Sequence, residues 1–103
     1  MPLESTISKN IMKAVRGKFP GTVILKRHVS MGVTGHPDLY GCLPGGQHFE
    51  IEVKQPGNTP TALQQERLAE WKAAGAITGV ATTVAQALAI LLQGKWDREH
   101  ERS

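Results

Sequence analysis

The chain has 103 residues, a length typical of one domain, and a formal net charge of +3. Its single cysteine, Cys42, excludes an intramolecular disulfide and the zinc sites that are built from pairs of cysteines. No apolar stretch approaches the roughly 18 residues of a membrane span, and residues 1–5 lack the basic and apolar regions of a signal peptide. We therefore expect a soluble cytoplasmic protein with no membrane partner, whose mildly basic charge permits a polyanionic one.

The N-terminal segment, residues 3–16, is predicted to be a helix because Ile7, Ile11 and Val15 recur every four residues as an apolar stripe. Basic side chains concentrate early in the chain, and those that we single out are Lys9, Lys13, Arg16, Lys26 and Arg27. Such residues are usually a solvated face, whereas in a protein that acts on nucleic acid they would hold phosphates.

Glu4 stands at the start of this helix, where a negative charge is favourable on its own account. Its spacing from Ile7 and Ile11, however, directs its side chain along the apolar stripe. A carboxylate that points toward the core needs a partner. We favour a metal ion, or a water bound to one, as that partner.

The other segments are strand-like or helical runs separated by turns that are rich in Gly and Pro. In chain order we predict strands over residues 22–29, 37–42 and 48–54, a helix over 61–74 that Gly75 closes, a strand over 76–82 and a helix over 83–92 that ends near Gly94. Residues 30–35 form a loop, and a turn at 43–47 joins two strands into a hairpin. The order α-β-β-β-α-β-α predicts an α/β or α+β fold in which helices cover a mixed sheet. We assign residues 1–94 to the domain and 95–103 to a charged tail.

The strand over residues 48–54 carries the most informative pattern, because its apolar and polar side chains alternate with a period of two. Glu52 and Lys54 therefore share one face, where Glu50 is expected to be a neighbour rather than a ligand. Asp38 begins the preceding strand and is expected to bring a second carboxylate beside Glu52. Two carboxylates hold a hard cation such as Mg²⁺, and a lysine beside the cation orients or deprotonates a water.

Each of these residues also has an ordinary interpretation. Asp38 following a proline is common in turns, and Glu52 with Lys54 would make an unremarkable surface ion pair. Their combination within one hairpin is less easily explained in that way. It favours metal-assisted hydrolysis of a phosphodiester.

Gln64 has two interpretations that the sequence does not separate. Thr61 and Gln64 fit a capping box, in which the glutamine side chain bonds back to the Thr61 N–H. Gln64 also shares a helix face with Leu68 and Trp71, from which it would hydrogen-bond an attacking water or a phosphate oxygen. His36 is a candidate for substrate contact, although a loop histidine is usually only solvated.

Together these residues resemble a known family. The resemblance is carried by Gly35-His36-Pro37-Asp38-Leu39, then Glu52-Val53-Lys54, then Gln64 and Gly75-Ala76, with Glu4 on the first helix. They are similar to the VRR-NUC branch of the PD-(D/E)XK nucleases over nearly the whole chain. The resemblance implies a restriction-endonuclease-like core. It also implies a Mg²⁺- or Mn²⁺-dependent endonuclease of the minimal, phage-type kind, a homodimer that cuts branched DNA, notably four-way (Holliday) junctions, and is encoded by a phage of a bacterial host.

The resemblance also implies a role for each matching position. The implied metal ligands are Glu4, Asp38, Glu52 and the backbone carbonyl of Val53. Lys54 would position or activate the water, and Gln64 would support the site. His36 departs from the family, in which small or aliphatic residues are common, and would alter substrate contact. The basic residues of the first helix would belong to the DNA-binding surface.

Two other functions stay open. One is a flap or nicking nuclease that acts on another branched structure. The other is a catalytically silent DNA-binding module that keeps the fold. The clustered carboxylates argue against the silent module, because a protein that only binds DNA has no need for acids near a phosphate.

Overall fold

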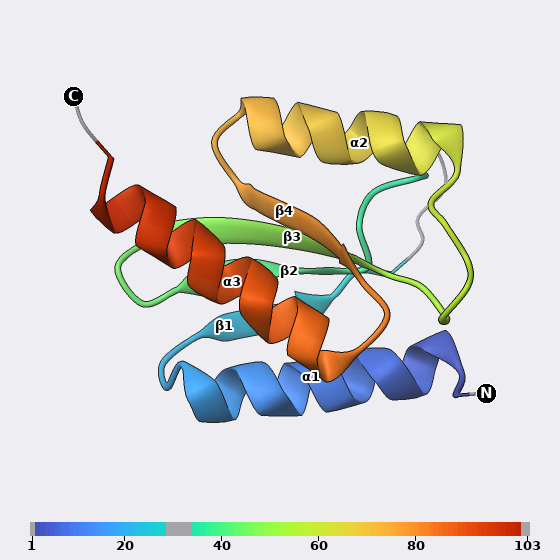
Figure 1. The fold of residues 1–103 in the computed structure, drawn as a ribbon, viewed down its shortest axis with the longest axis horizontal. Coiled ribbons are helices and arrows are strands. Elements are labelled where there is room, and N and C mark those ends of the chain that lie inside the picture. Colours follow the sequence, from blue (N-terminus) through green and yellow to red (C-terminus); the bar gives the residue numbers. More distant parts are fainter. Residues whose placement is uncertain (1, 29–33, 102–103) are drawn as a thin grey trace.

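The computed structural model describes residues 2–28 and 34–101, which fold into a mixed four-stranded sheet with helices on both faces (Figure 1). The elements are α1 (Glu4–Lys18), β1 (Val23–Lys26), β2 (Leu39–Leu43), β3 (Gln47–Val53), α2 (Ala62–Ala73), β4 (Ile77–Ala81) and α3 (Val84–Glu99). This order confirms the predicted α+β arrangement. The end of the first predicted strand at residue 29, and residues 30–33 of the predicted loop, lie outside the described residues.

The strands lie in the order β1-β2-β3-β4, with antiparallel pairing from β1 to β3 and parallel pairing of β3 with β4. The predicted hairpin of β2 and β3 is confirmed. β3 is therefore an inner strand, hydrogen-bonded on both sides. In the β2–β3 ladder Leu39 pairs with Ile51, a register that sets Asp38 opposite Glu52.

The hydrophobic core lies between one face of the sheet and the helices α1 and α3. Phe49, Ile51 and Val53 of β3 are fully buried there, as the alternation predicts. The predicted stripe of α1 also joins this core through Ile11 and Val15. The period of two in β3 and the period of about four in α1 thus meet in one apolar layer.

The opposite face of the sheet carries Glu50 and Glu52, and α2 packs against β3 and β4. Both glutamates are buried, with exposed fractions of 0% and 1%. The interpretation of Glu52 as half of a surface ion pair is therefore wrong. An inner strand with helices on both faces hides its polar side chains as completely as its apolar ones.

The helix ends follow local rules at α2 but not at α3. Thr61 and Gln64 form the predicted capping box, and Gly75 has φ +105°, as a residue that closes a helix in the left-handed region does. The predicted end of α3 near Gly94 is wrong, since α3 continues to Glu99. A Cβ on Gly94 would collide with the side chain of Ile77, so this glycine allows α3 to approach β4 and does not end the helix.

Within residues 2–28 and 34–101, no helix has both the length and the apolar character that crossing a membrane requires.

Gly41 lies where β2 passes close to β1, and a Cβ there would collide with the carbonyl oxygen of Val23. Because a backbone atom of a paired strand has no room to move aside, we expect Gly41→Ala to lower the free energy of unfolding by about 3 kcal/mol or more.

Gly17, in α1, has open space around it. Gly17→Ala should therefore raise the free energy of unfolding by about 0.5–1 kcal/mol. Urea unfolding measures both changes, and an unchanged midpoint for Gly41→Ala would contradict the close approach of the strands.

Candidate active site

The carboxylates of Asp38 and Glu52 lie side by side on the face of the sheet that α2 partly covers. Asp38 directly precedes β2, and the ladder sets it opposite Glu52 on β3. Its Oδ2 accepts a hydrogen bond from the Val53 N–H at 2.9 Å. The hairpin thus brings together the two acids that the sequence predicts as neighbours.

Glu52 is the unusual member of this pair. Both of its carboxyl oxygens are buried and accept no hydrogen bond from the described residues, and the Asp38 carboxyl lies close enough to hydrogen-bond Glu52 when Glu52 is protonated. Burial, and secondarily the Asp38 carboxyl beside it, raise the pKa of Glu52 from an ordinary 4.5 to about 8, against the opposing effect of Lys54. The site is therefore short of positive charge.

Lys54 stands at the end of β3 on the same face as Glu52. Its Nζ lies 3.7 Å from Glu52 Oε2, and its side chain is 13% exposed. The distance is that of an ion pair but too long for a hydrogen bond. The ammonium therefore lies beside Glu52 without donating a hydrogen bond to it.

The Val53 carbonyl belongs to the same corner. The Lys54 N–H donates to the Ala81 carbonyl of β4, whereas the Val53 N–H points the other way, to Asp38. In an extended residue the N–H and the C=O point to the same side of the strand, so the Val53 carbonyl oxygen also faces the Asp38 side.

These groups suit a hard divalent cation in their chemistry. Two carboxylates and a backbone carbonyl are the oxygen ligands that Mg²⁺ and Mn²⁺ prefer. A cation bound there would compensate the buried oxygens of Glu52, which accept no hydrogen bond from the described residues.

Glu4 is not drawn into this acidic pair. Within the described residues, no three His, Cys, Asp or Glu side chains lie close enough together to hold a metal ion. Glu4 is partly exposed at the start of α1. That end of α1 lies near the exit of β3, because the Gln55 side chain donates to the Pro2 carbonyl at 2.9 Å. Its role as a ligand stays a prediction.

Gln64 is half-buried on α2, and its Oε1 accepts from the Thr61 N–H at 2.9 Å. The capping role is therefore filled, and a second role toward a water or a phosphate stays a prediction. The predicted DNA-contacting residues are distributed between two places. Lys9, Lys13 and Arg16 are exposed on α1, Lys26 is exposed at the end of β1, and His36 and Arg27 are partly buried near Asp38.

Sequence reasoning missed a polar network next to the acidic pair. Glu50 binds Arg27 through both oxygens and also lies 2.6 Å from His48 Nε2. Trp71 of α2 stacks on His48 and donates from Nε1 to His36 Nδ1 at 3.1 Å. The only signal in the sequence is the shared face of Glu50 and Glu52, which does not specify the partner across the sheet.

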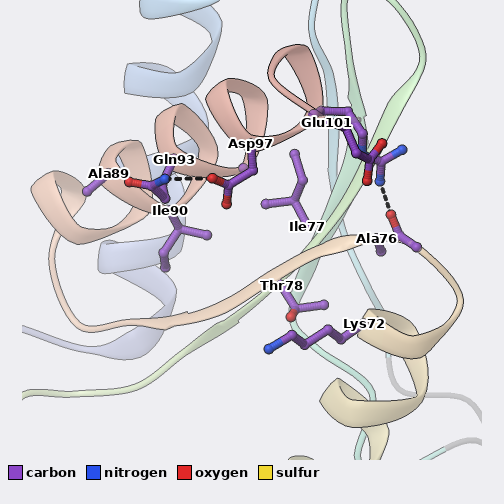
Figure 2. A pocket seen from close by; sticks show the side chains of 12 residues that line it. Lys72, Ala76, Ile77, Thr78, Ala89, Ile90, Gln93, Asp97 and Glu101 are labelled. Atoms are coloured by element: carbon purple, nitrogen blue, oxygen red, sulfur yellow. Dashed lines mark hydrogen bonds between the residues drawn. The ribbon is translucent and has the colours of Figure 1, made fainter. Parts of the chain in front are cut away.

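A hollow of about 730 Å³ lies elsewhere, between α3, β4 and the end of α2 (Figure 2). It is bounded by Ile77 and Ile90 and by charged side chains such as Lys72 and Asp97, the last of which accepts a hydrogen bond from Gln93. Its opposing charges and open shape supply no group that resembles the acidic pair. We therefore place the candidate active site at Asp38, Glu52 and Lys54.

The raised pKa of Glu52 has a consequence for the metal-free protein. The unfolded chain loses the Glu52 proton near pH 4.5, whereas the folded protein keeps it up to about pH 8. Between these values unfolding releases a proton, so the free energy of unfolding falls as the pH rises. Glu52→Gln has no such proton to lose. With EDTA present, we expect the free energy of unfolding of Glu52→Gln minus that of the wild type to be roughly 2–4 kcal/mol larger at pH 8 than at pH 5.

Urea midpoints of the wild type and of Glu52→Gln at the two pH values measure this difference. Glu70→Gln, at an exposed glutamate of α2, is the matched control and should lack it. A constant difference between the wild type and Glu52→Gln at both pH values would mean that Glu52 is already ionised at pH 5 in the folded protein.

Several solved structures share this fold. One, described as a VRR_NUC domain, aligns with a TM-score of 0.61 over 91% of this chain and 96% of its own, at 24% sequence identity. Another, described as a VRR_NUC domain protein, aligns with a TM-score of 0.70 over 89% of this chain and 87% of its own, also at 24% identity. No protein-family model and no curated protein sequence matches the chain. The chain therefore has the fold of VRR_NUC domains, which confirms the predicted resemblance at the level of the fold.

Proposed function

We propose that the chain is a divalent-metal-dependent DNA endonuclease. The observation that carries the proposal is the Glu52 carboxyl group, whose buried oxygens accept no hydrogen bond in the described part of the chain and lie beside Asp38 and Lys54. A buried carboxylate left in this state destabilises a fold, and strongly shifted pKa values concentrate at functional sites. A cation held between Asp38 and Glu52 would remove that cost.

The residues would divide the chemistry among themselves. Asp38, Glu52 and the Val53 carbonyl would hold Mg²⁺ or Mn²⁺, which supplies a Lewis acid for the scissile phosphate and lowers the pKa of a water. Glu4, which stands apart from the pair, would act through a bound water. Gln64 would support the site through its Nε2, since its Oε1 is engaged in the helix cap.

Lys54 would have the most direct part in the reaction. Its ammonium lies next to Glu52 without being hydrogen-bonded to it, and is therefore free to orient a water for in-line attack. The same charge would stabilise the negative charge that develops on the phosphate. The 3′ oxygen would leave, so the expected products carry 5′-phosphate and 3′-hydroxyl ends.

We extend the proposal to branched DNA, with four-way junctions as the favoured substrate and a homodimer as the active form. The exposed basic residues Lys9, Lys13, Arg16 and Lys26 would contact the phosphate backbone. A two-fold axis would set two active sites on opposite strands of a junction. A flap or nicking nuclease is the alternative that uses the same chemistry on another branched structure.

A catalytically silent DNA-binding module is the alternative from a different class. It would retain the basic residues but would gain nothing from an acid pair whose inner member, Glu52, is buried and is only partly compensated by Lys54 at 3.7 Å. Such a residue persists in a fold when it serves a function that offsets its cost. The proposed nuclease and the silent module differ in what the replacement of Lys54 does to DNA cleavage.

Replacing Lys54 should abolish cleavage but leave binding. With Mg²⁺ or Mn²⁺ present, we expect Lys54→Ala to cut labelled DNA at least about 100-fold more slowly, because it loses the group that orients the water, with little change in affinity for DNA. EDTA should stop the wild type completely. Lys95→Ala, at a lysine that pairs with Glu99 on the surface of α3, is the matched control and should cut normally. Binding without cutting by the wild type, under either metal, would favour the silent module.

The proposed substrate and assembly have their own test. Initial rates on a four-way junction, a flap and a plain duplex of the same sequence should be highest on the junction. Light scattering should give twice the mass of the chain. Preferential cutting of the flap would favour the alternative nuclease, and a monomer with full activity would contradict the two-fold arrangement.

A further inference from the structure

Arg27 holds the backbone around Asp38 by two hydrogen bonds. Its main-chain N–H donates to the Asp38 carbonyl at 2.6 Å, and its Nη1 donates to the Pro37 carbonyl at 2.7 Å. The carbonyls of two successive residues are therefore fixed by one arginine. Asp38 is thereby kept where its own Oδ2 accepts the Val53 N–H.

Glu50 in turn holds the guanidinium of Arg27. Its Oε1 accepts from Nη1 at 2.6 Å and its Oε2 from Nη2 at 3.3 Å, and the carboxylate is fully buried. His48 Nε2 lies 2.6 Å from Glu50 Oε2. The rings of Tyr40 and Trp71 flank the guanidinium, with centroids 4.3 and 5.5 Å from its central carbon. The arginine is thus restrained from several directions.

The segment before Asp38 is also held from α2. Trp71 Nε1 donates to His36 Nδ1 at 3.1 Å. Gly35, with φ +77°, packs so closely on α2 that a Cβ would lie 2.6 Å from Leu63 Cγ. Residues 35–38 are therefore fixed on one side by α2 and on the other by Arg27.

We propose that Arg27, held by Glu50, is a positioning residue that sets Asp38 against Glu52 at the separation a divalent cation requires. The inference rests on the proposed function, because it assigns the cation to Asp38 and Glu52. The planar guanidinium suits this role, since one fork bonds the Glu50 carboxylate and the Pro37 carbonyl together. A lysine would supply the charge without the fork.

This role differs from the phosphate contact that the sequence suggested for Arg27. Three of the five N–H donors of its side chain are engaged within the protein, and its side chain is only 21% exposed. Residues that orient a metal ligand from behind typically change metal affinity by about 10–100-fold when they are replaced. A phosphate contact would instead change the affinity for DNA and its dependence on salt.

The test uses Arg27→Lys, which keeps the charge and the ion pair but loses the fork, and Glu50→Gln, which keeps the shape but loses the charge that holds Arg27. Arg98→Lys is the matched control, because that guanidinium also donates to a backbone carbonyl, that of Gly75. Mn²⁺ affinity is measured by electron paramagnetic resonance without DNA. Cleavage is then measured as kcat and KM at several Mn²⁺ concentrations, and thermal unfolding gives the folded fraction of each variant.

We expect Arg27→Lys and Glu50→Gln to weaken Mn²⁺ binding by about 10-fold or more. They should lower kcat at limiting Mn²⁺, with KM for DNA unchanged and with partial rescue by excess Mn²⁺. Arg98→Lys should behave as the wild type. A rise in KM with unchanged Mn²⁺ affinity would overturn the inference in favour of a phosphate contact. A lower melting temperature with normal Mn²⁺ affinity and kcat in the folded fraction would overturn it in favour of a purely structural role.

The wild type separates the failure of this inference from the failure of the proposed function. If the wild type neither binds Mn²⁺ nor cuts DNA, both are overturned together. If the wild type does both, Asp38→Ala abolishes Mn²⁺ binding and Arg27→Lys leaves it intact, the inference about Arg27 alone fails. Should Arg27→Lys prove unfolded, Trp71→Phe removes the indole N–H that holds His36 and leaves a smaller aromatic ring beside His48 and Arg27. That variant must then weaken Mn²⁺ binding, or the positioning of this segment is not what the cation depends on.

Discussion

The site depends on the pairing of β3 with a strand on each side. An inner strand has no free edge, and here helices also pack over both of its faces, so every side chain from Phe49 to Val53 is buried whatever its polarity. The apolar side chains of one face build the core with α1 and α3. The side chains of the other face include two glutamates. Burial removes their hydration, which costs free energy unless a hydrogen bond or an opposite charge replaces it. The chemistry of the molecule follows from which charged and hydrogen-bonding groups surround each glutamate.

Glu50 and Glu52 are two residues apart on the same strand and equally buried, yet their surroundings are opposite. Glu50 is neutralised by Arg27 and has His48 beside it, so its cost is met within the chain. Glu52 has only a lysine at the distance of an ion pair and a second carboxyl alongside. Burial, and secondarily the Asp38 carboxyl, raise its pKa to about 8 against the opposing effect of Lys54. One glutamate thus serves the architecture, and the other keeps an unmet demand for positive charge.

Much of this arrangement was predictable, and the remainder was not for identifiable reasons. The period of two in β3 and the short turn after β2 were enough to predict that Asp38 faces Glu52, because a hairpin fixes its own register. The same alternation could not tell a half-exposed strand from one covered on both faces, so the burial of Glu52 was missed. The predicted helix end at Gly94 is wrong because the contact of Gly94 with Ile77 comes from packing between α3 and β4, which leaves no trace in the local sequence.

The partnership of Arg27 with Glu50 is the clearest case of a long-range feature. The two residues are 23 positions apart, and the sequence placed Arg27 among exposed basic residues because its neighbours are basic. Only the ladder reveals the row that crosses the sheet. β1 pairs with β2 so that Lys26 meets Leu39, which sets Arg27 opposite Asp38, and Asp38 opposite Glu52. Propensity and periodicity describe single strands and are silent on such rows.

The hairpin also determines the order in which the site matures during synthesis. Asp38, Glu52, Val53 and Lys54 all lie on one hairpin, and segments that lie close in sequence meet on the microsecond timescale. The helix α2 and strand β4, which cover and flank β3, leave the ribosome later. We therefore expect a nascent chain to bring the two acids close to each other before residues 62–81 dock and bury Glu52. The free energy for holding Glu52 in its buried state is supplied by the second half of the chain. Truncation after β3 would leave Glu52 in contact with water and would also remove the contacts of α2 that hold residues 35–38.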